Sequence, residues 1–221
     1  MSLKSLAAAV AATLLALPAS AATLSFAGTG ASHKIGRAFD NQTAAYKALV
    51  PRGAVRKGDV ISVIDGRAKS AAHGLSVSGP ARVTYTFLGA EAGNRNFTAS
   101  DGAILFRNHD AVGASLTVAQ RLAGLVDFAF GTDHPLSHAG LISNAGVAAP
   151  RSSRYAIGYG SIFNEGRSAI VFFDDIAASD RDFDDMTVRI DVAAVPVPAA
   201  GLMLVAGLGG LAALRRRRAA A

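Results

Sequence analysis

Arg82-Val83-Thr84-Tyr85-Thr86-Phe87-Leu88 alternates between polar and apolar side chains along its length. Because successive side chains of a β-strand point to opposite faces, the stretch presents an apolar face and a face of arginine and threonine. Its β-branched and aromatic residues are those enriched in strands. The stretch therefore predicts a strand with one face turned towards a core. The same kind of apolar and β-branched pattern predicts strands elsewhere in the chain.

Further short segments with β-branched or aromatic content lie on both sides of this strand, separated by Gly, Asp, Asn and Pro. The predicted strands are Thr23–Ala27, Val60–Ile64, Arg82–Leu88, Asn96–Ala99, Ala103–Phe106, Ala114–Ala119, Leu125–Phe130, Arg154–Gly158, Ala169–Phe173 and Met186–Val192. Strands at nearly regular spacing, without alternating helices, are typical of an all-β fold, and we expect an antiparallel β-sandwich of jelly-roll type.

Other stretches are expected to connect these strands. The segment from Phe39 to Val50 favours a short helix through its alanines and leucine. We predict loops from Gly66 to Pro80 and from Gly131 to Arg151, since both stretches are polar and rich in turn residues. The glycines of Gly158-Tyr159-Gly160 indicate a bulge or turn, because the sequence lacks the lysine of a phosphate-binding loop.

The two ends of the chain differ from its middle in composition. Met1 to Ala21 has Lys4, an apolar stretch and then Ala19-Ser20-Ala21, and is typical of a secretory signal peptide, whose apolar stretch forms a helix, cleaved after Ala21. A retained membrane helix is the alternative. At the other end, no charged residue occurs from Val192 to Leu214, and four arginines follow, Arg215, Arg216, Arg217 and Arg218.

The C-terminal apolar run predicts a short transmembrane helix. Ala199 to Leu214 would rise roughly 24 Å as a helix, somewhat less than a bilayer core of about 30 Å. Basic residues that flank a span remain on the cytoplasmic side, so the arginines predict that the preceding residues are exported. This tail divides the chain into a signal peptide (1–21), an exported domain (22–194) and a membrane tail (195–221).

The tail resembles a sorting signal of the PEP-CTERM type, in its Val-Pro-Leu-Pro-Ala variant. The resemblance is carried by the motif Val195-Pro196-Val197-Pro198-Ala199, the apolar run and the arginine cluster, with Val197 where the variant usually has Leu. It implies recognition by an exosortase, a membrane protease that cuts near the proline motif and transfers or releases the exported domain. A plain C-terminal membrane anchor is the alternative.

Charge is distributed unevenly along the chain. The net charge of +6 comes from 22 Lys and Arg against 16 Asp and Glu, and Lys4 with the four terminal arginines provides five of the cations. The exported domain therefore has 17 cations and 16 anions, or +1, which gives no basic face for nucleic acid. The chain has no cysteine, so its stability depends on packing and on any bound ion rather than on disulfides.

An acidic stretch close to the end of the exported domain holds the strongest candidate site. Six carboxylates fall within twelve residues: Asp174, Asp175, Asp180, Asp182, Asp184 and Asp185. Crowded carboxylates repel one another unless a positive group is present, and Arg181 and Arg189 neutralise only part of the charge. Ca²⁺ is bound by six to eight oxygen ligands in flexible geometry, so we expect these residues to bind calcium. Phe183 is expected to anchor the segment in the core.

The alternative to calcium is a solvated acidic turn in which the aspartates accept hydrogen bonds from their own backbone. The stretch also resembles a domain of unknown function that recurs in secreted bacterial proteins, with a Phe-Glu-Asp strand end followed by Asp-x-Asp-Phe-Asn-Asp. Here Asp174 replaces the Glu and Asp184 replaces the Asn. This resemblance, over about residues 81 to 192, implies a β-sandwich with a calcium corner and no established catalytic activity.

The remaining motifs favour a protein that is not an enzyme. His134 and His138 have the spacing of a helical zinc pair, but Pro135 makes a helix through them unfavourable. Asp127 is expected to be a turn-bonding carboxylate. No Gly-x-Ser-x-Gly motif occurs, although a triad whose members meet only in space leaves no local signal.

We therefore expect an exported structural or adhesive protein of the cell surface or extracellular matrix, stabilised by Ca²⁺, with exosortase, membrane and extracellular polysaccharide as partners. A carbohydrate-binding module is the first alternative, although the chain has no Trp and only four Tyr to stack on sugars. A secreted hydrolase is the second.

Overall fold

The computed structural model describes residues 21–27, 31–36, 44–65 without 53 and 55, 74–133, 140–147, 155–175 and 181–195, and the isolated positions 207, 209, 210 and 215. The chain divides into a compact unit from Ala22 to Ala193 and a second unit that comprises both ends. All the buried hydrophobic residues of the described segments lie between Ala22 and Val192, so the first unit, here called the body, has a core of its own.

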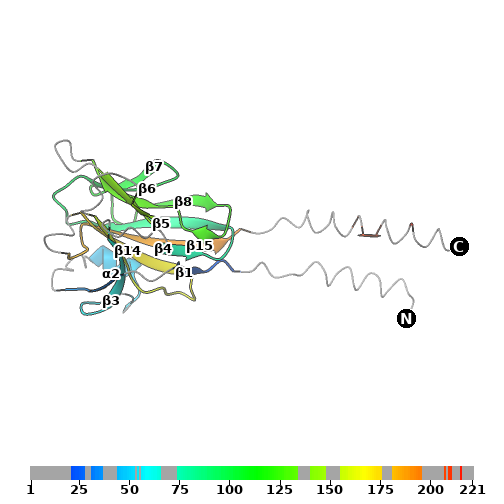
Figure 1. The fold of residues 1–221 in the computed structure, drawn as a ribbon, viewed down its shortest axis with the longest axis horizontal. Coiled ribbons are helices and arrows are strands. Elements are labelled where there is room, and N and C mark those ends of the chain that lie inside the picture. Colours follow the sequence, from blue (N-terminus) through cyan, green and yellow to red (C-terminus); the bar gives the residue numbers. More distant parts are fainter. Residues whose placement is uncertain are drawn as a thin grey trace. The chain divides into compact units, whose positions relative to one another are not determined.

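The body is built from antiparallel strands and a short helix (Figure 1). The strands are β1 (Leu24–Ala27), β2 (Ala31–Lys34), β3 (Val60–Asp65), β4 (Gly74–Val77), β5 (Ala81–Gly89), β6 (Asn96–Ser100), β7 (Ala103–Arg107), β8 (Ser115–Gln120), β9 (Gly124–Leu125), β10 (Ala129–Thr132), β11 (Gly140–Ser143), β12 (Gly146–Val147), β13 (Ala156–Tyr159), β14 (Ser168–Asp174) and β15 (Met186–Ala194). The helix is α2 (Ala44–Leu49), within the predicted stretch, of which residues 39–43 lie outside the described part.

The strands form three sheets. The largest has the order β2-β3-β13-β14-β15-β5-β8, the second β12-β11-β10-β6-β7 and the smallest β1-β4-β9. The strand pairs are antiparallel, which confirms the all-β prediction. Chain neighbours such as β14 and β15 pair directly, whereas β5 pairs with β15 from the far end of the body.

The predicted strand at residues 82–88 lies within β5, and its alternation is confirmed. Val83, Tyr85 and Phe87 are each 1% exposed on the face turned towards the core. Near the end of the strand the opposite face is covered too, because Leu88 packs into a second cluster and is fully buried. Burying a side chain of this size stabilises the fold by about 1.5–3 kcal/mol.

The two larger sheets contact each other through aromatic side chains. The Phe130 ring of β10 stacks on the Phe173 ring of β14 with centroids 5.3 Å apart. The Phe106 ring of β7 lies 6.0 Å from the Phe87 ring of β5. Both pairs join one sheet to the other, so this interface is the main core of the body.

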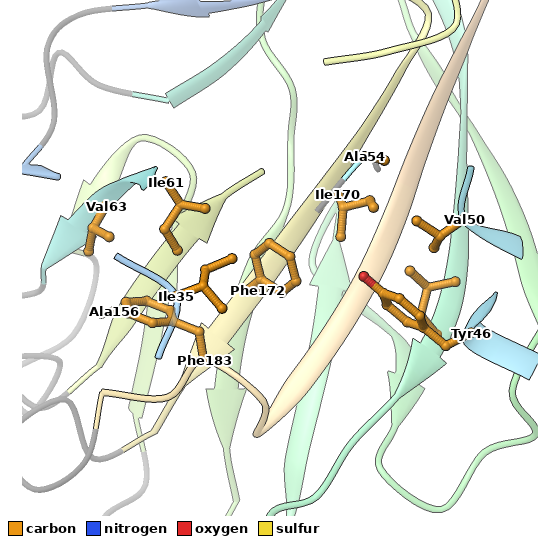
Figure 2. Packing of buried hydrophobic residues seen from close by; sticks show 11 residues of the cluster. Ile35, Tyr46, Val50, Ala54, Ile61, Val63, Ala156, Ile170, Phe172 and Phe183 are labelled. Atoms are coloured by element: carbon orange, nitrogen blue, oxygen red, sulfur yellow. The ribbon is translucent and has the colours of Figure 1, made fainter. Parts of the chain in front are cut away.

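The other face of the largest sheet is covered by α2 and neighbouring segments (Figure 2). Figure 2 shows Phe172 and Ile170 of β14 between Ile61 of β3 on one side and Tyr46 of α2 on the other. The Arg189 guanidinium of β15 donates a hydrogen bond to the Leu49 carbonyl oxygen at 2.6 Å, which fixes the end of the helix against the sheet. Strand β14 is therefore buried on both faces.

Several sequence predictions are wrong in detail, and the structure has more strands than expected. The predicted loop 66–80 contains β4, and the predicted loop 131–151 contains β11 and β12. The predicted strand Leu125–Phe130 is divided between β9 and β10, with residues 126–128 outside both. These short strands pair with distant partners, so tertiary contacts rather than local propensity decide their conformation.

The prediction of a bulge or turn at Gly158-Tyr159-Gly160 is also wrong at Gly158. Gly158 lies inside β13 rather than in a bulge or turn, paired with Val63 on one side and Phe172 on the other. A Cβ at this position would lie 2.6 Å from the Ile61 side chain and 3.0 Å from the Phe183 side chain. The glycine thus serves close packing of the strand against its neighbours.

Candidate functional site

The acidic residues meet where β14 ends and β15 begins. The two strands pair antiparallel with Phe173 opposite Met186, so the residues that follow Phe173 lie beside those that precede Met186. This register brings Asp174 and Asp175 next to Asp184 and Asp185. We call these four residues and Asp182 the acidic corner. The antiparallel pairing itself is the reason that carboxylates ten residues apart in the chain share one site.

The acidic corner is largely buried. Asp174 is fully buried, Asp175 is 4% exposed and Asp184 is 6% exposed, while Asp182 and Asp185 are half-buried. Burying a carboxylate is unfavourable unless it is paired or hydrogen-bonded. A solvated acidic turn, the alternative to calcium, would leave these side chains in water, but three of them are buried.

Hydrogen bonds connect the corner to the second sheet. The Asn96 side-chain amide of β6 donates to the Asp175 Oδ2 atom at 2.7 Å. The Asp175 backbone N–H donates to the Asp185 Oδ2 atom at 2.7 Å. Asp175 thus connects the two ends of the acidic segment and also links the two sheets.

Burial and mutual repulsion change the acidity of two members. Burial raises the pKa of Asp184 to about 8, with further increases from a hydrogen bond to Asp182 and from the charges of Asp182 and Glu91. Burial also raises the pKa of Asp185 to about 8, followed by the charge of Asp175, while the Asp175 N–H bond opposes the increase. Both shifts mean that ionising Asp184 or Asp185 costs more free energy in the folded protein than in water.

The two arginines near the corner have ion-pair partners outside it. Arg181 pairs with Asp65 at 2.7 Å, and Arg189 pairs with Asp191 of its own strand at 2.7 Å. Arg181 and Phe183 have φ values of 49° and 62°, so the backbone before Asp184 is not an extended strand. Phe183 is 1% exposed in the second cluster, which confirms its predicted role as the anchor of the segment.

The donor atoms at the corner are oxygens, which suit a hard cation such as Ca²⁺. Two more oxygens lie on paired residues of the second sheet. Asn96 and Thr132 are register partners, 0% and 2% exposed, and the Asn96 Oδ1 and Thr132 Oγ1 atoms accept or donate no hydrogen bond within the described part of the chain. A buried amide oxygen beside carboxylates fits a calcium ligand set.

The described residues alone do not form a closed metal site. Within them, no three His, Cys, Asp or Glu side chains converge in a metal-binding arrangement. Asp180, one of the predicted ligands, lies outside the described residues, between Asp175 and Arg181. If calcium binds here, Asp175 and Asp185 would hold it, with Asn96 turning its amide oxygen towards the ion.

A second polar cluster surrounds Asn144, which the sequence analysis missed. This residue is 1% exposed, and its amide donates to the carbonyl oxygens of Leu75 and Val126, both at 2.7 Å. Its Oδ1 atom accepts from the Leu75 N–H at 2.8 Å and from the Tyr159 hydroxyl at 2.9 Å. All the polar atoms of this side chain are thus satisfied. No local pattern predicts it, because its partners are 15 to 69 residues away.

A cleft of about 520 Å³ lies between β8 and the turn after β6. Its polar lining includes Asp101, Gln120 and Asp127, and its apolar lining includes Leu122 and Val118. The Asp127 carboxylate accepts from the Asp101 N–H at 2.6 Å, which confirms its predicted turn-bonding role. The Gln120 Oε1 atom is buried without a hydrogen bond to the described residues.

The other residues that the sequence analysis weighed, including the histidine pair for which zinc is unfavourable, lie mostly outside the described residues. These are His134, His138, Ala19, Pro196, Val197, Pro198, Ala199, Arg216, Arg217 and Arg218. Ala21 and Val195 are described and exposed, at the two ends of the body, and Arg215 is described at an exposed helical position. In the segments that the structure describes, no helix has the length and apolar character needed to cross a membrane.

Comparisons with family models, with curated proteins and with solved structures find no match to this chain.

Proposed function

We propose that the chain is an exported protein with a structural or adhesive role at the cell surface or in the extracellular matrix, sorted by an exosortase. Its body is a β-sandwich of jelly-roll type that Ca²⁺ stabilises at the acidic corner. The observation that carries the proposal is the burial of Asp174, Asp175 and Asp184 beside Asn96, whose Oδ1 atom has no hydrogen bond to the described residues.

Calcium has a physical reason to bind at this position. Asp184 and Asp185 have raised pKa values because their charges are buried and close to like charges. A bound cation would lower these pKa values again, because it favours the deprotonated carboxylates. Its binding free energy would also stabilise the folded state. An ion at the β14–β15 junction would therefore clamp the largest sheet to β6 through Asp175 and Asn96.

Thermal unfolding with and without calcium tests the proposal. We expect millimolar CaCl₂ to raise the Tm of residues 22–194 and a chelator to reverse the shift, because a ligand of the native state stabilises it by mass action. Asp175→Asn retains an acceptor for the Asn96 amide but removes a charged ligand, and should abolish the shift. Asp59→Asn, which removes the same charge from a turn far along the chain from the corner, is the control.

Two results would contradict the calcium proposal. One is a Tm of the unsubstituted protein that calcium leaves unchanged, supported by an absence of binding in equilibrium dialysis. The other is an equal calcium shift in Asp175→Asn and in the unsubstituted protein. A shift produced equally by MgCl₂ would indicate general charge screening, because Mg²⁺ requires a smaller octahedral site.

The sorting part of the proposal is supported by the order of the proline motif, the apolar run and the arginine cluster. Fractionation of the cells followed by mass determination of the C-terminus tests it, in the full chain and in a chain that lacks Arg215 to Arg218. We expect the mature protein to end near Pro198, and the deletion to prevent this processing. An intact tail on the mature protein, unaffected by the deletion, would rule the sorting proposal out.

Carbohydrate binding is the second candidate, and the cleft beside β8 favours it. Sugar hydroxyls need acceptors such as the Asp127 carboxylate, and the exposed, apolar Leu122 offers a surface for a sugar ring. A glycan array should then give hits that Leu122→Asp removes. An array without hits would remove this candidate and leave the structural role.

A further inference from the structure

In the described part of the chain the three sheets have six terminal strands, and five of them are protected against pairing with another chain. Protection matters because an edge strand presents unpaired N–H and C=O groups that accept another strand. The protected edges are β1, β2, β7, β9 and β12. Among the residues that the structure describes, the sixth edge, β8, has none of the usual protection.

Each protected edge has an identifiable device. Strand β9 has only two residues, and β12 has two within the part of the chain that the structure describes. In β1, the Leu24 N–H donates to the Gly166 carbonyl oxygen at 2.6 Å, so a loop already occupies part of the edge. Strand β2 carries the exposed Lys34, and the register of β7 shifts between Thr98 and Ala99 of its partner strand, as at a bulge.

Strand β8 lacks these devices. It pairs with β5 over six consecutive residues without a register shift, and its sequence Ser-Leu-Thr-Val-Ala-Gln has no charged residue and no proline. Leu116 is 45% exposed on this edge, although the residue is apolar. On the opposite face of the sheet the Thr117 hydroxyl lies 2.9 Å from that of Thr84, a hydrogen bond that links β8 to β5.

The charges around β8 indicate which chain would pair with it. Residues 111–120 carry no charge, and the run is bounded by the exposed Asp110 at its start and the exposed Arg121 at its end. Because the two β8 strands run in opposite directions, the end of the strand near Arg121 in one copy lies towards the end near Asp110 in the other. The exported domain has a net charge of +1, so two copies approach without strong repulsion.

We propose that two copies of this chain associate through antiparallel pairing of their β8 strands, which joins the two largest sheets into one. Twofold pairing is self-complementary, as a closed dimer requires. The main-chain groups of β8 supply the hydrogen bonds, and Leu116 of each copy is covered by the other. The association does not depend on the calcium site and should persist in chelator.

Disulfide trapping in the full chain tests this pairing directly, because the chain has no cysteine of its own. Single cysteines are introduced as Ser115→Cys, Thr117→Cys and Ala119→Cys, at exposed positions of β8. In a twofold antiparallel pair one residue lies opposite its own copy, and the proposal places the axis at Ser115, Thr117 or Ala119, so that one of these positions falls within the Cα separation of about 4.4–6.8 Å that a disulfide needs. We expect at least one of the three to give a linked dimer under mild oxidation. Ser32→Cys, at an exposed position of β2, is the control and should give no disulfide-linked dimer.

A charge variant gives an independent measurement. Thr117→Lys places a lysine of each copy at the shared edge, and we expect it to weaken dimerisation of residues 22–194 at least about tenfold in sedimentation equilibrium. Thr117→Val also loses the bond to Thr84 but stays uncharged, and should retain the dimer. Ser32→Lys adds the same charge to β2 and should have no effect.

The proposal would be overturned by any of three outcomes. The unsubstituted protein could be monomeric at all soluble concentrations. Cysteines on β8 could crosslink no better than Ser32→Cys. Thr117→Lys could leave the dimer unchanged while its Tm and circular dichroism show a folded protein.

Discussion

Two asparagines, Asn96 and Asn144, are buried to the same extent, yet their surroundings differ. Asn144 makes four hydrogen bonds with short distances, to main-chain groups and to a neutral tyrosine. Asn96 binds a carboxylate of the acidic corner, and its own oxygen has no hydrogen bond to the described residues. A fully satisfied hydrogen-bond network, such as that of Asn144, stabilises the fold. An incomplete network beside buried charge, such as that of Asn96, indicates a place for a ligand.

The largest expected effect comes from opening the closed network. Asn144→Ala removes the partners of the Leu75 N–H, the Val126 carbonyl and the Tyr159 hydroxyl, each at a cost of about 1–3 kcal/mol, while the Leu75 carbonyl still accepts from the Val126 N–H. We expect the free energy of unfolding to fall by about 3–5 kcal/mol, equally with and without calcium. Urea denaturation measures this loss, with the half-buried Asn94→Ala as the control. A loss below about 1 kcal/mol would mean that Asn144 is not a structural centre.

The pH dependence of stability should distinguish the acidic corner from the Asn144 network. Asp184 and Asp185 have pKa values near 8 in the folded protein, against 3.8 for an ordinary Asp. In the unfolded chain they lose their protons near pH 4, whereas in the folded protein they keep them until about pH 8. The stability that protonation provides is therefore complete below pH 4 and is lost as the pH rises towards 8.

In calcium-free buffer we expect the free energy of unfolding to fall by about 2 kcal/mol between pH 5 and pH 8, after allowance for solvent screening. Asp185→Asn should reduce this slope, and calcium should reverse it, because the ion binds the deprotonated form. Urea midpoints at several pH values measure the effect. A slope of the opposite sign without calcium would show that the corner is stable as a charged cluster.

Asn96→Ala should have a smaller effect than Asn144→Ala, although both remove a buried amide. Only one strong hydrogen bond is lost, from the Asn96 amide to Asp175, so we expect a loss of about 1–2 kcal/mol without calcium. The variant should also bind calcium more weakly, since an oxygen ligand disappears. An Asn96→Ala variant that is as destabilised as Asn144→Ala and binds calcium normally would show that Asn96 has a structural role and is not a calcium ligand.

The smallest expected effect comes from Tyr159→Phe. The change removes one of four hydrogen bonds to Asn144 and keeps the ring, which packs at 5.7 Å from Phe26. We expect a loss of about 1 kcal/mol or less, because the Asn144 Oδ1 atom still accepts from the Leu75 N–H. A thermal melt with the double variant Tyr159→Phe/Asn144→Ala should show that the two effects are not additive.

Much of the architecture could be predicted because alternation is a local property. The β5 and β14 predictions are confirmed, since each strand carries its own apolar pattern, and Phe183 anchors the acidic segment as expected. Strands β4, β11 and β12 were predicted as loops. Their residues have weak propensity, and they become strands only because a neighbour such as β1 or β10 supplies hydrogen bonds.

The amino-acid sequence was sufficient to predict an acidic site, because its aspartates are close together in the chain whatever fold the chain adopts. It also set the alternation of β5 and the difference in charge between the ends and the body. Only the tertiary structure decided which carboxylates are buried, that Asn96 meets Asp175 from 79 residues away, and that β8 forms an uncharged edge. The physical reason is that burial and pairing are set by residues distant in the chain, and one stretch of sequence carries no information about its partner.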